Sequence, residues 1–394
     1  MADTPQQATS AGSGGLSDHT GPVHVLDELG DLWFLVGEGL QTEENPSPPW
    51  AFRVCSRTVA RSSPVFKTML FGGWAESKPP TECPNKEWII RLPEDKPEIM
   101  ECLLRAMHGD FGCAGFIDMR QPSQVEIIYL TIEHADKYVC LAVLGPWSAS
   151  WIAACSGMVK SRSWGSIHRL CSLNDRDAEI YPMMAAITYM LGSTEVYSRV
   201  MLYMADCYPL YSRKATLYFA RCEAFIPDLK DIIKSHRRAL LTAVLEPAQD
   251  MVFELENGDP EFPTAHVMTH ECNTEDEEAE CASRNHAVML HWLQHYNLWP
   301  LPSPADAHRL PGVIAASLKD VFRDGRPSDS GPAGEFEFHC PVQESECGSC
   351  PWTNSDGFAF EEEYDRFECT LSTGELRFMA RQRRLLNTRW SYKL

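Results

Sequence analysis

Long apolar runs are absent from this chain of 394 residues, since no stretch approaches the about 18 uninterrupted apolar residues that a membrane-spanning helix needs. The first residues, MADTPQQATSAGSGGLSD, also lack the basic and apolar stretches of a secretory signal. We therefore expect a protein of the cytoplasm or nucleus, with no membrane partner. Thiols stay reduced there, so the 15 cysteines are expected to be mostly core residues rather than a disulfide framework.

Positive charge is scarce as well. Lys and Arg number 35 against 55 Asp and Glu, which gives a formal net charge of −20. This balance would repel a polyanion, and no zinc-finger or helix-turn-helix pattern supports specific recognition of nucleic acid. The hydrophobic fraction of 44% is ordinary for a globular protein and excludes disorder of the whole chain, collagen-like repeats and coiled coil.

Recognisable catalytic motifs are also missing. The glycine-rich stretch 12–15 lacks the Lys-Ser/Thr pair of a phosphate-binding loop, and no G-x-S-x-G or kinase motif occurs. His291 and His295 lie one helical turn apart, but Trp292 stands where a zinc protease needs its glutamate. Cys55 falls on a predicted apolar surface rather than in a reactive site. We therefore expect no enzyme, and a catalytic alternative would have to be located in the C-terminal helical region.

Composition divides the chain into four parts. Residues 1–22 are polar and expected to be disordered, 23–156 to form an α+β domain, 157–256 to be helical, and 257–394 to be helical and rich in Cys and Pro. Apolar patterns predict strands at 31–36, 50–54 and 88–92, with the first two paired, and helices at 56–60, 63–70, 98–108, 122–138 and 140–155. Further helices are predicted at 181–191, 194–206, 214–222, 228–245, 286–296, 310–322 and 374–394.

Two of the early helices carry start signals. Ser56 is expected to N-cap the first, and either Ser62 or Ser63, with Pro64 in the first turn, opens the second. Gly145-Pro146 must kink or restart the last helix of the α+β domain. The apolar surface that the helix pair presents to the sheet is expected to comprise Val54, Val59, Phe66, Met69 and Leu70.

Four ordered segments carry a resemblance to a known family. They are GDLWFLVG (30–37), AFRVCSRTVARSSPVFKTMLFGGWAES (51–77), IIRLPEDKPEIMECLLRAMHGDF (89–111) and EHADKYVC (133–140). Together they make residues 31–154 similar to the BTB/POZ domain, in the form common among fungal proteins. The resemblance implies a small sheet with clustered helices, and a module that binds proteins without a reaction of its own.

The triplet Trp74-Ala-Glu76 follows the second helix, outside its apolar periodicity. In BTB domains that act as ubiquitin-ligase adaptors, a hydrophobic-x-Glu triplet at this place contacts the cullin scaffold. Carried over by position, the resemblance makes Trp74 the apolar anchor and Glu76 its polar partner. The alternative is that Trp74 folds back over the helices of its own domain.

Cysteines near the C-terminus have metal-ligand spacing. Cys347 and Cys350 form a C-x-x-C pair, and Cys340 precedes it by seven residues. In a reducing compartment this spacing is typical of a tetrahedral structural zinc site. The fourth ligand is left open among four residues, namely His339, Cys281, Cys272 and His286. The alternative is that these cysteines are ordinary free thiols.

The last predicted helix is basic, with Arg377, Arg381, Arg383 and Arg384. It could dock on the acidic remainder of the chain, meet an acidic partner, or act as a nuclear address. For the whole chain we expect a substrate-recruiting adaptor of a cullin-type ubiquitin ligase, whose region 172–394 recruits the target. The alternative is a transcription-associated scaffold in which the BTB domain pairs with itself as a homodimer.

Overall fold

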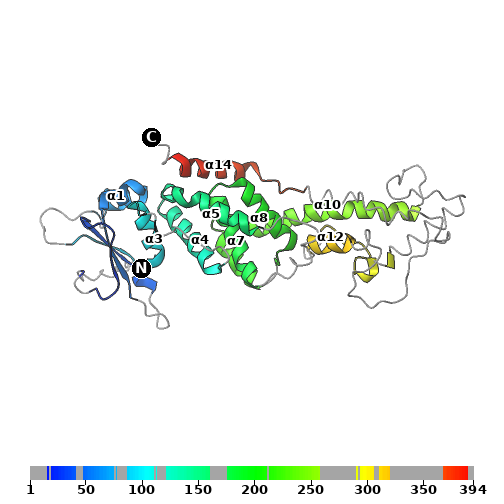
Figure 1. The fold of residues 1–394 in the computed structure, drawn as a ribbon, viewed down its shortest axis with the longest axis horizontal. Coiled ribbons are helices and arrows are strands. Elements are labelled where there is room, and N and C mark those ends of the chain that lie inside the picture. The colour runs from blue at the N-terminus through cyan, green and yellow to red at the C-terminus, as the bar shows by residue number, and fades with distance from the viewer. Residues whose placement is uncertain are drawn as a thin grey trace, which may run out of the picture. The chain divides into compact units, whose positions relative to one another are not determined.

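The computed structural model describes a chain that divides into two compact units. Unit 1 comprises Met1–Ala154 with Ala380–Leu394, and unit 2 comprises Cys155–Met379. Each unit is described by itself (Figure 1). The residues that the structure describes are 16, 19–40, 48–74, 77, 87–110, 112, 121–159, 175–210, 213–257, 290–291, 293–305, 310–319 and 367–388.

Unit 1 contains a four-stranded sheet in the order β1-β3-β2-β4. The strands are β1 (Val23–Val25), β2 (Leu32–Val36), β3 (Trp50–Val54) and β4 (Ile89–Leu92). The predicted pairing of the first two apolar runs is confirmed, because β2 and β3 are antiparallel with Phe34 opposite Phe52. β4 runs parallel to β2, and β1 runs parallel to β3. β1 was not predicted, because a three-residue strand with two exposed valines has no apolar pattern to mark it.

The helices of unit 1 come in the order that the sequence predicts, with α1 and α2 between β3 and β4 and the others after β4, and the chain as described is α+β. They are α1 (Ser56–Ser62), α2 (Pro64–Phe71), α3 (Pro97–Met107), α4 (Pro122–Lys137), the 3-10 helix Leu141–Leu144 and α5 (Gly145–Met158). The predicted restart at Gly145-Pro146 is confirmed, since a 3-10 turn ends there and α5 begins. α1 lies against α2 and α3, and α3 packs on β3 (Figure 1).

The predicted apolar surface of the helix pair is confirmed except at Met69. Val54, Val59, Phe66 and Leu70 are fully buried, but Met69 is only half-buried and lies at the surface.

The predicted N-cap of α1 needs a correction, because Ser56 is the first residue of the helix and Cys55 is its N-cap. The backbone N–H and the hydroxyl of Ser56 both donate to the Asp31 carboxylate at 2.8 Å. The Asp31 carboxylate, just before β2, therefore supplies the acceptor that caps α1, a role that the sequence predicts for Ser56.

Unit 2 is helical in its described residues. Its helices are α7 (Asp175–Met190), α8 (Thr194–Cys207), α9 (Arg213–Cys222), α10 (Leu229–Asn257), α12 (Pro311–Lys319) and the start of α14 (Thr373–Thr388). α10 runs well past its predicted end at 245, because Ala248 and Val252 continue the buried face that packs with α12. The predicted helix 286–296 is described only in part. No described helix is long and apolar enough to cross a membrane.

Ser63 fixes the start of α2 and joins it to the end of α4. Its hydroxyl oxygen accepts from the backbone N–H of Phe66 at 3.0 Å, which makes Ser63 rather than Ser62 the N-cap. The same hydroxyl donates to the carbonyl of Tyr138 at 2.5 Å. The ring of Tyr138 stacks on Phe66, with 4.2 Å between ring centroids. A single buried side chain thus joins the start of α2 to the end of α4, through two residues that are 75 positions apart.

Replacing Ser63 with alanine is expected to destabilise the fold by about 2 kcal/mol, because the change removes an N-cap and leaves the buried Tyr138 carbonyl without its donor. Ser62→Ala is the matched control, since Ser62 makes neither contact and should change stability little. Urea-induced unfolding of the full chain, followed by circular dichroism, measures both. Equal stability of the two variants would contradict the assignment of Ser63 as the cap.

Candidate functional site

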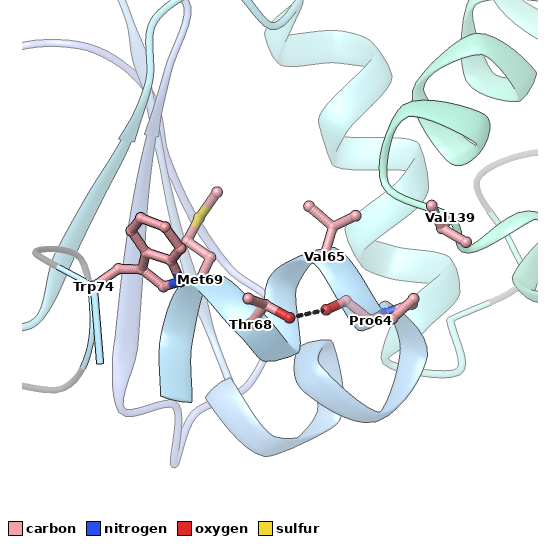
Figure 2. A pocket seen from close by; sticks show the side chains of 6 residues that line it. All are labelled: Pro64, Val65, Thr68, Met69, Trp74 and Val139. Atoms are coloured by element: carbon pink, nitrogen blue, oxygen red, sulfur yellow. Dashed lines mark hydrogen bonds between the residues drawn. The ribbon is translucent and has the colours of Figure 1, made fainter. Parts of the chain in front are cut away.

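The outward face of α2 borders a shallow hollow in unit 1. Its volume is about 560 Å³. The lining residues are Pro64, Val65, Thr68, Met69, Trp74 and Val139, and we call this hollow the α2 groove. Figure 2 shows the indole of Trp74 beside Met69 at one end, and Val139 facing α2 from the other. The groove is therefore formed by one face of α2, by Trp74, which follows α2, and by Val139, which follows α4.

Trp74 is held out at the end of α2 by a tight turn. Gly73 has a φ of +82°, a conformation that glycine adopts at little cost. The hydroxyl of Ser77 accepts from the Gly73 N–H at 2.9 Å and donates to the Met69 carbonyl at 3.2 Å. The Trp74 side chain lies beside Met69 in the lining of the groove. It is 65% exposed, so its own domain does not enclose it. Glu76, its predicted polar partner, lies outside the described residues.

Val139 forms the opposite end of the groove in an unusual backbone conformation. Its φ is +50°, which costs an L-residue roughly 1–2 kcal/mol, and its side chain is 61% exposed. The turn is held by two backbone bonds, from Val139 N–H to the Asp136 carbonyl at 2.9 Å and from Cys140 N–H to the Ala135 carbonyl at 2.7 Å. Sequence reasoning missed Val139, because nothing in the pattern marks a valine at a left-handed helix end.

A second hollow lies on the other side of Val65 and Met69. Its volume is about 380 Å³, and its remaining lining is Arg91, Leu92, Pro93, Glu94, Asp95, Lys137 and Tyr138. Val65 and Met69, one helical turn apart, thus form an apolar ridge with an apolar hollow on one side and a charged wall on the other.

Asp95 organises the charged wall although its side chain is almost fully buried. It accepts from the Tyr138 hydroxyl and, at 2.6 Å, from the Lys137 ammonium. Burial and the adjacent Asp95 carboxylate raise the pKa of Tyr138 well above its ordinary range, so the phenol stays a donor. The turn before α3 is thereby bonded to the end of α4.

His134 faces the same carboxylate from inside the fold. Its Nδ1–H donates to the Leu130 carbonyl at 2.9 Å, and its Nε2 lies 3.5 Å from Asp95 without a hydrogen-bond partner among the described residues. Burial lowers the pKa of His134 below its ordinary value of 6.5, against the opposing pull of Asp95. The folded chain therefore favours the neutral imidazole.

This lowered pKa makes stability depend on pH. The unfolded chain binds the proton more readily, so stability is full above the ordinary value of 6.5 and falls as the pH drops below it. His134→Asn keeps a donor for the Leu130 carbonyl but removes the titration. Unfolding free energies at about pH 7.5 and pH 5 should therefore differ less in the variant than in wild type. An equal difference in the variant and in wild type would contradict the assignment. Part of the pH dependence that remains in the variant comes from His236, whose pKa burial also lowers.

The α2 groove offers no group suited to catalysis. No acid, base or thiol is among its lining residues, and the Thr68 hydroxyl donates to the Pro64 carbonyl at 3.0 Å. Cys55 and Cys102, like the other described cysteines, are in no disulfide. What the groove can do is bury an apolar side chain of a partner against Trp74, Met69 and Val65.

The predicted zinc ligands lie outside the described residues. This holds for the set Cys340, Cys347, Cys350 and His339 and for the alternative fourth ligands. Within the described part of the chain, no group of three or more His, Cys, Asp or Glu is placed to hold a metal. The zinc site therefore stays a prediction from spacing.

Metal analysis of the full chain, purified without chelator, tests this prediction. About one equivalent of zinc is expected, because a structural site with three thiolates binds tightly. Substituting Cys347→Ser and Cys350→Ser should abolish it, whereas Cys55→Ser and Cys102→Ser, at described cysteines outside the predicted ligand set, should not. Zinc far below one equivalent in wild type would overturn the site.

Comparison with known proteins adds no relative. No protein-family model, no curated protein and no solved structure matches this chain. The BTB/POZ resemblance consequently rests on the four sequence segments that carry it. The geometry of the α2 groove is the separate basis for a functional proposal.

Proposed function

We propose that this chain is a non-enzymatic protein–protein interaction protein whose N-terminal α+β domain is of the BTB/POZ type. The proposal rests on the four ordered sequence segments and on the exposed indole of Trp74 beside an apolar groove. A Trp at the surface of a soluble domain exposes a large apolar area to water, and such residues dominate binding energy at protein interfaces. The mechanism is recruitment by surface complementarity, without a covalent step.

The partner of the groove in this proposal is the N-terminal domain of a cullin scaffold. Trp74 and Glu76 occupy the places of the hydrophobic-x-Glu triplet of BTB adaptors, and the groove lies next to the first of them. An apolar side chain of the cullin would enter between Trp74 and Val139, and Glu76 would supply the polar contact. The region 172–394 would then recruit the target that the ligase modifies.

Self-association is the second candidate, and a specific observation favours it. β1 is an edge strand whose Val23 and Val25 are about half exposed, and Leu29 just after it is 92% exposed. Apolar residues on a sheet edge are a common site for pairing with another chain. Light scattering at low micromolar concentration tests this scaffold alternative, and a monomer would contradict it.

Calorimetric titration of the full chain with a cullin N-terminal domain tests the adaptor proposal. Wild type should bind at micromolar affinity or tighter, and Trp74→Ala should weaken binding by about 2 kcal/mol, as truncation of a hot-spot tryptophan does. The melting temperature should hardly change, because the removed side chain is mostly exposed.

Leu29→Ala is the matched control, since it removes an exposed apolar side chain outside the groove. Its affinity for the cullin domain should equal that of wild type. A folded wild-type chain that does not bind would overturn the adaptor proposal. A large loss of melting temperature in Trp74→Ala would instead make Trp74 a residue that its own domain needs for stability.

A further inference from the structure

Among the residues that the structure describes, two serines stand directly before a proline. They are Ser63, before Pro64 in unit 1, and Ser303, before Pro304 in unit 2. One class of enzymes, the proline-directed serine/threonine kinases, selects a hydroxyl that is followed at once by proline. Both serines have this sequence, and their surroundings in the fold differ.

Ser63 is closed to a kinase in the folded chain. Its side chain is fully buried, and its hydroxyl donates to the Tyr138 carbonyl and accepts from the Phe66 N–H. A kinase needs the hydroxyl oxygen at its own active site, next to the γ-phosphate of ATP. Ser63 could therefore react only after the start of α2 separates from the end of α4.

Ser303 is open to a kinase, because its side chain is exposed in the segment 298–305 that precedes α12. Its hydroxyl oxygen accepts from the Ala305 N–H at 3.2 Å. A local hydrogen bond between exposed groups is readily exchanged for a bond to water or to another protein, so it does not protect the hydroxyl.

Prolines keep the backbone of this segment extended. Pro300, Pro302 and Pro304 stand at every second position, and each fixes its own φ. The residue before a proline favours an extended conformation, and Ser303 is such a residue outside any helix or strand. Protein kinases bind their substrates as extended chain, so Ser303 needs little rearrangement to enter a kinase active site.

The segment is anchored beside the serine. Leu298 is buried in the hydrophobic cluster of α10 and α12, Leu301 packs against that cluster, and Pro302 is buried as well. Ser303 is exposed, so a phosphate there would stay in water. It would add a charge of about −1.5 to −2 without breaking the contacts of the anchor.

We propose that Ser303 is a phosphorylation site for a proline-directed serine/threonine kinase. The Ser303 Oγ attacks the γ-phosphorus of ATP, the bond from that phosphorus to the β–γ bridging oxygen breaks, and ADP leaves. The hydroxyl proton passes to the catalytic aspartate of the kinase. This site goes beyond the proposed function and does not depend on it, because it needs only the exposed serine and its proline.

Incubation of the full chain with an active mitogen-activated protein kinase and Mg·ATP, followed by mass spectrometry of tryptic peptides, tests the proposal. Ser303 is the only serine or threonine in the tryptic peptide 285–309, so a phosphate on that peptide locates the site. Wild type should carry it. Pro304→Ala keeps the serine but should slow its phosphorylation about tenfold or more, since the enzyme loses the residue that it selects.

Ser63 is the matched control within the same chain. Its tryptic peptide 62–67 should acquire phosphate about a hundredfold more slowly than 285–309, because Ser63 must first be exposed by local opening. A synthetic peptide of residues 58–70, which has no fold to bury Ser63, should be phosphorylated readily. Three outcomes would overturn the proposal: no phosphate on Ser303 in the full chain, equal rates at Ser303 and Ser63 in the full chain, or an undiminished rate in Pro304→Ala.

Discussion

The buried contact of Ser63 with Tyr138 is the interaction on which the α2 groove depends. Ser63 caps α2 and donates to the Tyr138 carbonyl, while the Tyr138 hydroxyl reaches Asp95 in the turn before α3. Three segments far apart in sequence are thus joined through one tyrosine. Because these polar groups are buried and paired, moving α2 would leave donors and acceptors unsatisfied. The ridge of Val65 and Met69 is consequently held at a fixed place.

The same contact explains how an unfavourable backbone conformation persists. Val139 follows Tyr138 directly and adopts a positive φ that a β-branched residue avoids. Such strain is retained where the surroundings fix the chain, and Tyr138 is fixed at its carbonyl, its ring and its hydroxyl. A groove whose walls are already in place loses little conformational entropy when a partner binds, which favours affinity at a shallow surface.

The sequence predicts the elements of unit 1 well because their apolar periodicity is strong, as in β2 and α3. It leaves Ser62 and Ser63 open, because both stand just before Pro64 and only the contacts of Ser63 with Phe66 and Tyr138 in the folded chain distinguish them. The α2 groove could be predicted at Trp74, which stands outside the helical pattern, but not at Val139. The backbone turn after α4 places Val139 at the groove, and a valine in the sequence does not mark such a turn.

The two sides of the Val65 and Met69 ridge differ in the physical force that each would use. The α2 groove is lined by uncharged side chains, so binding there would depend on burial of apolar area, which salt does not screen. The wall beyond the ridge carries Arg91, Glu94 and Lys137, so a contact there would weaken as ionic strength rises.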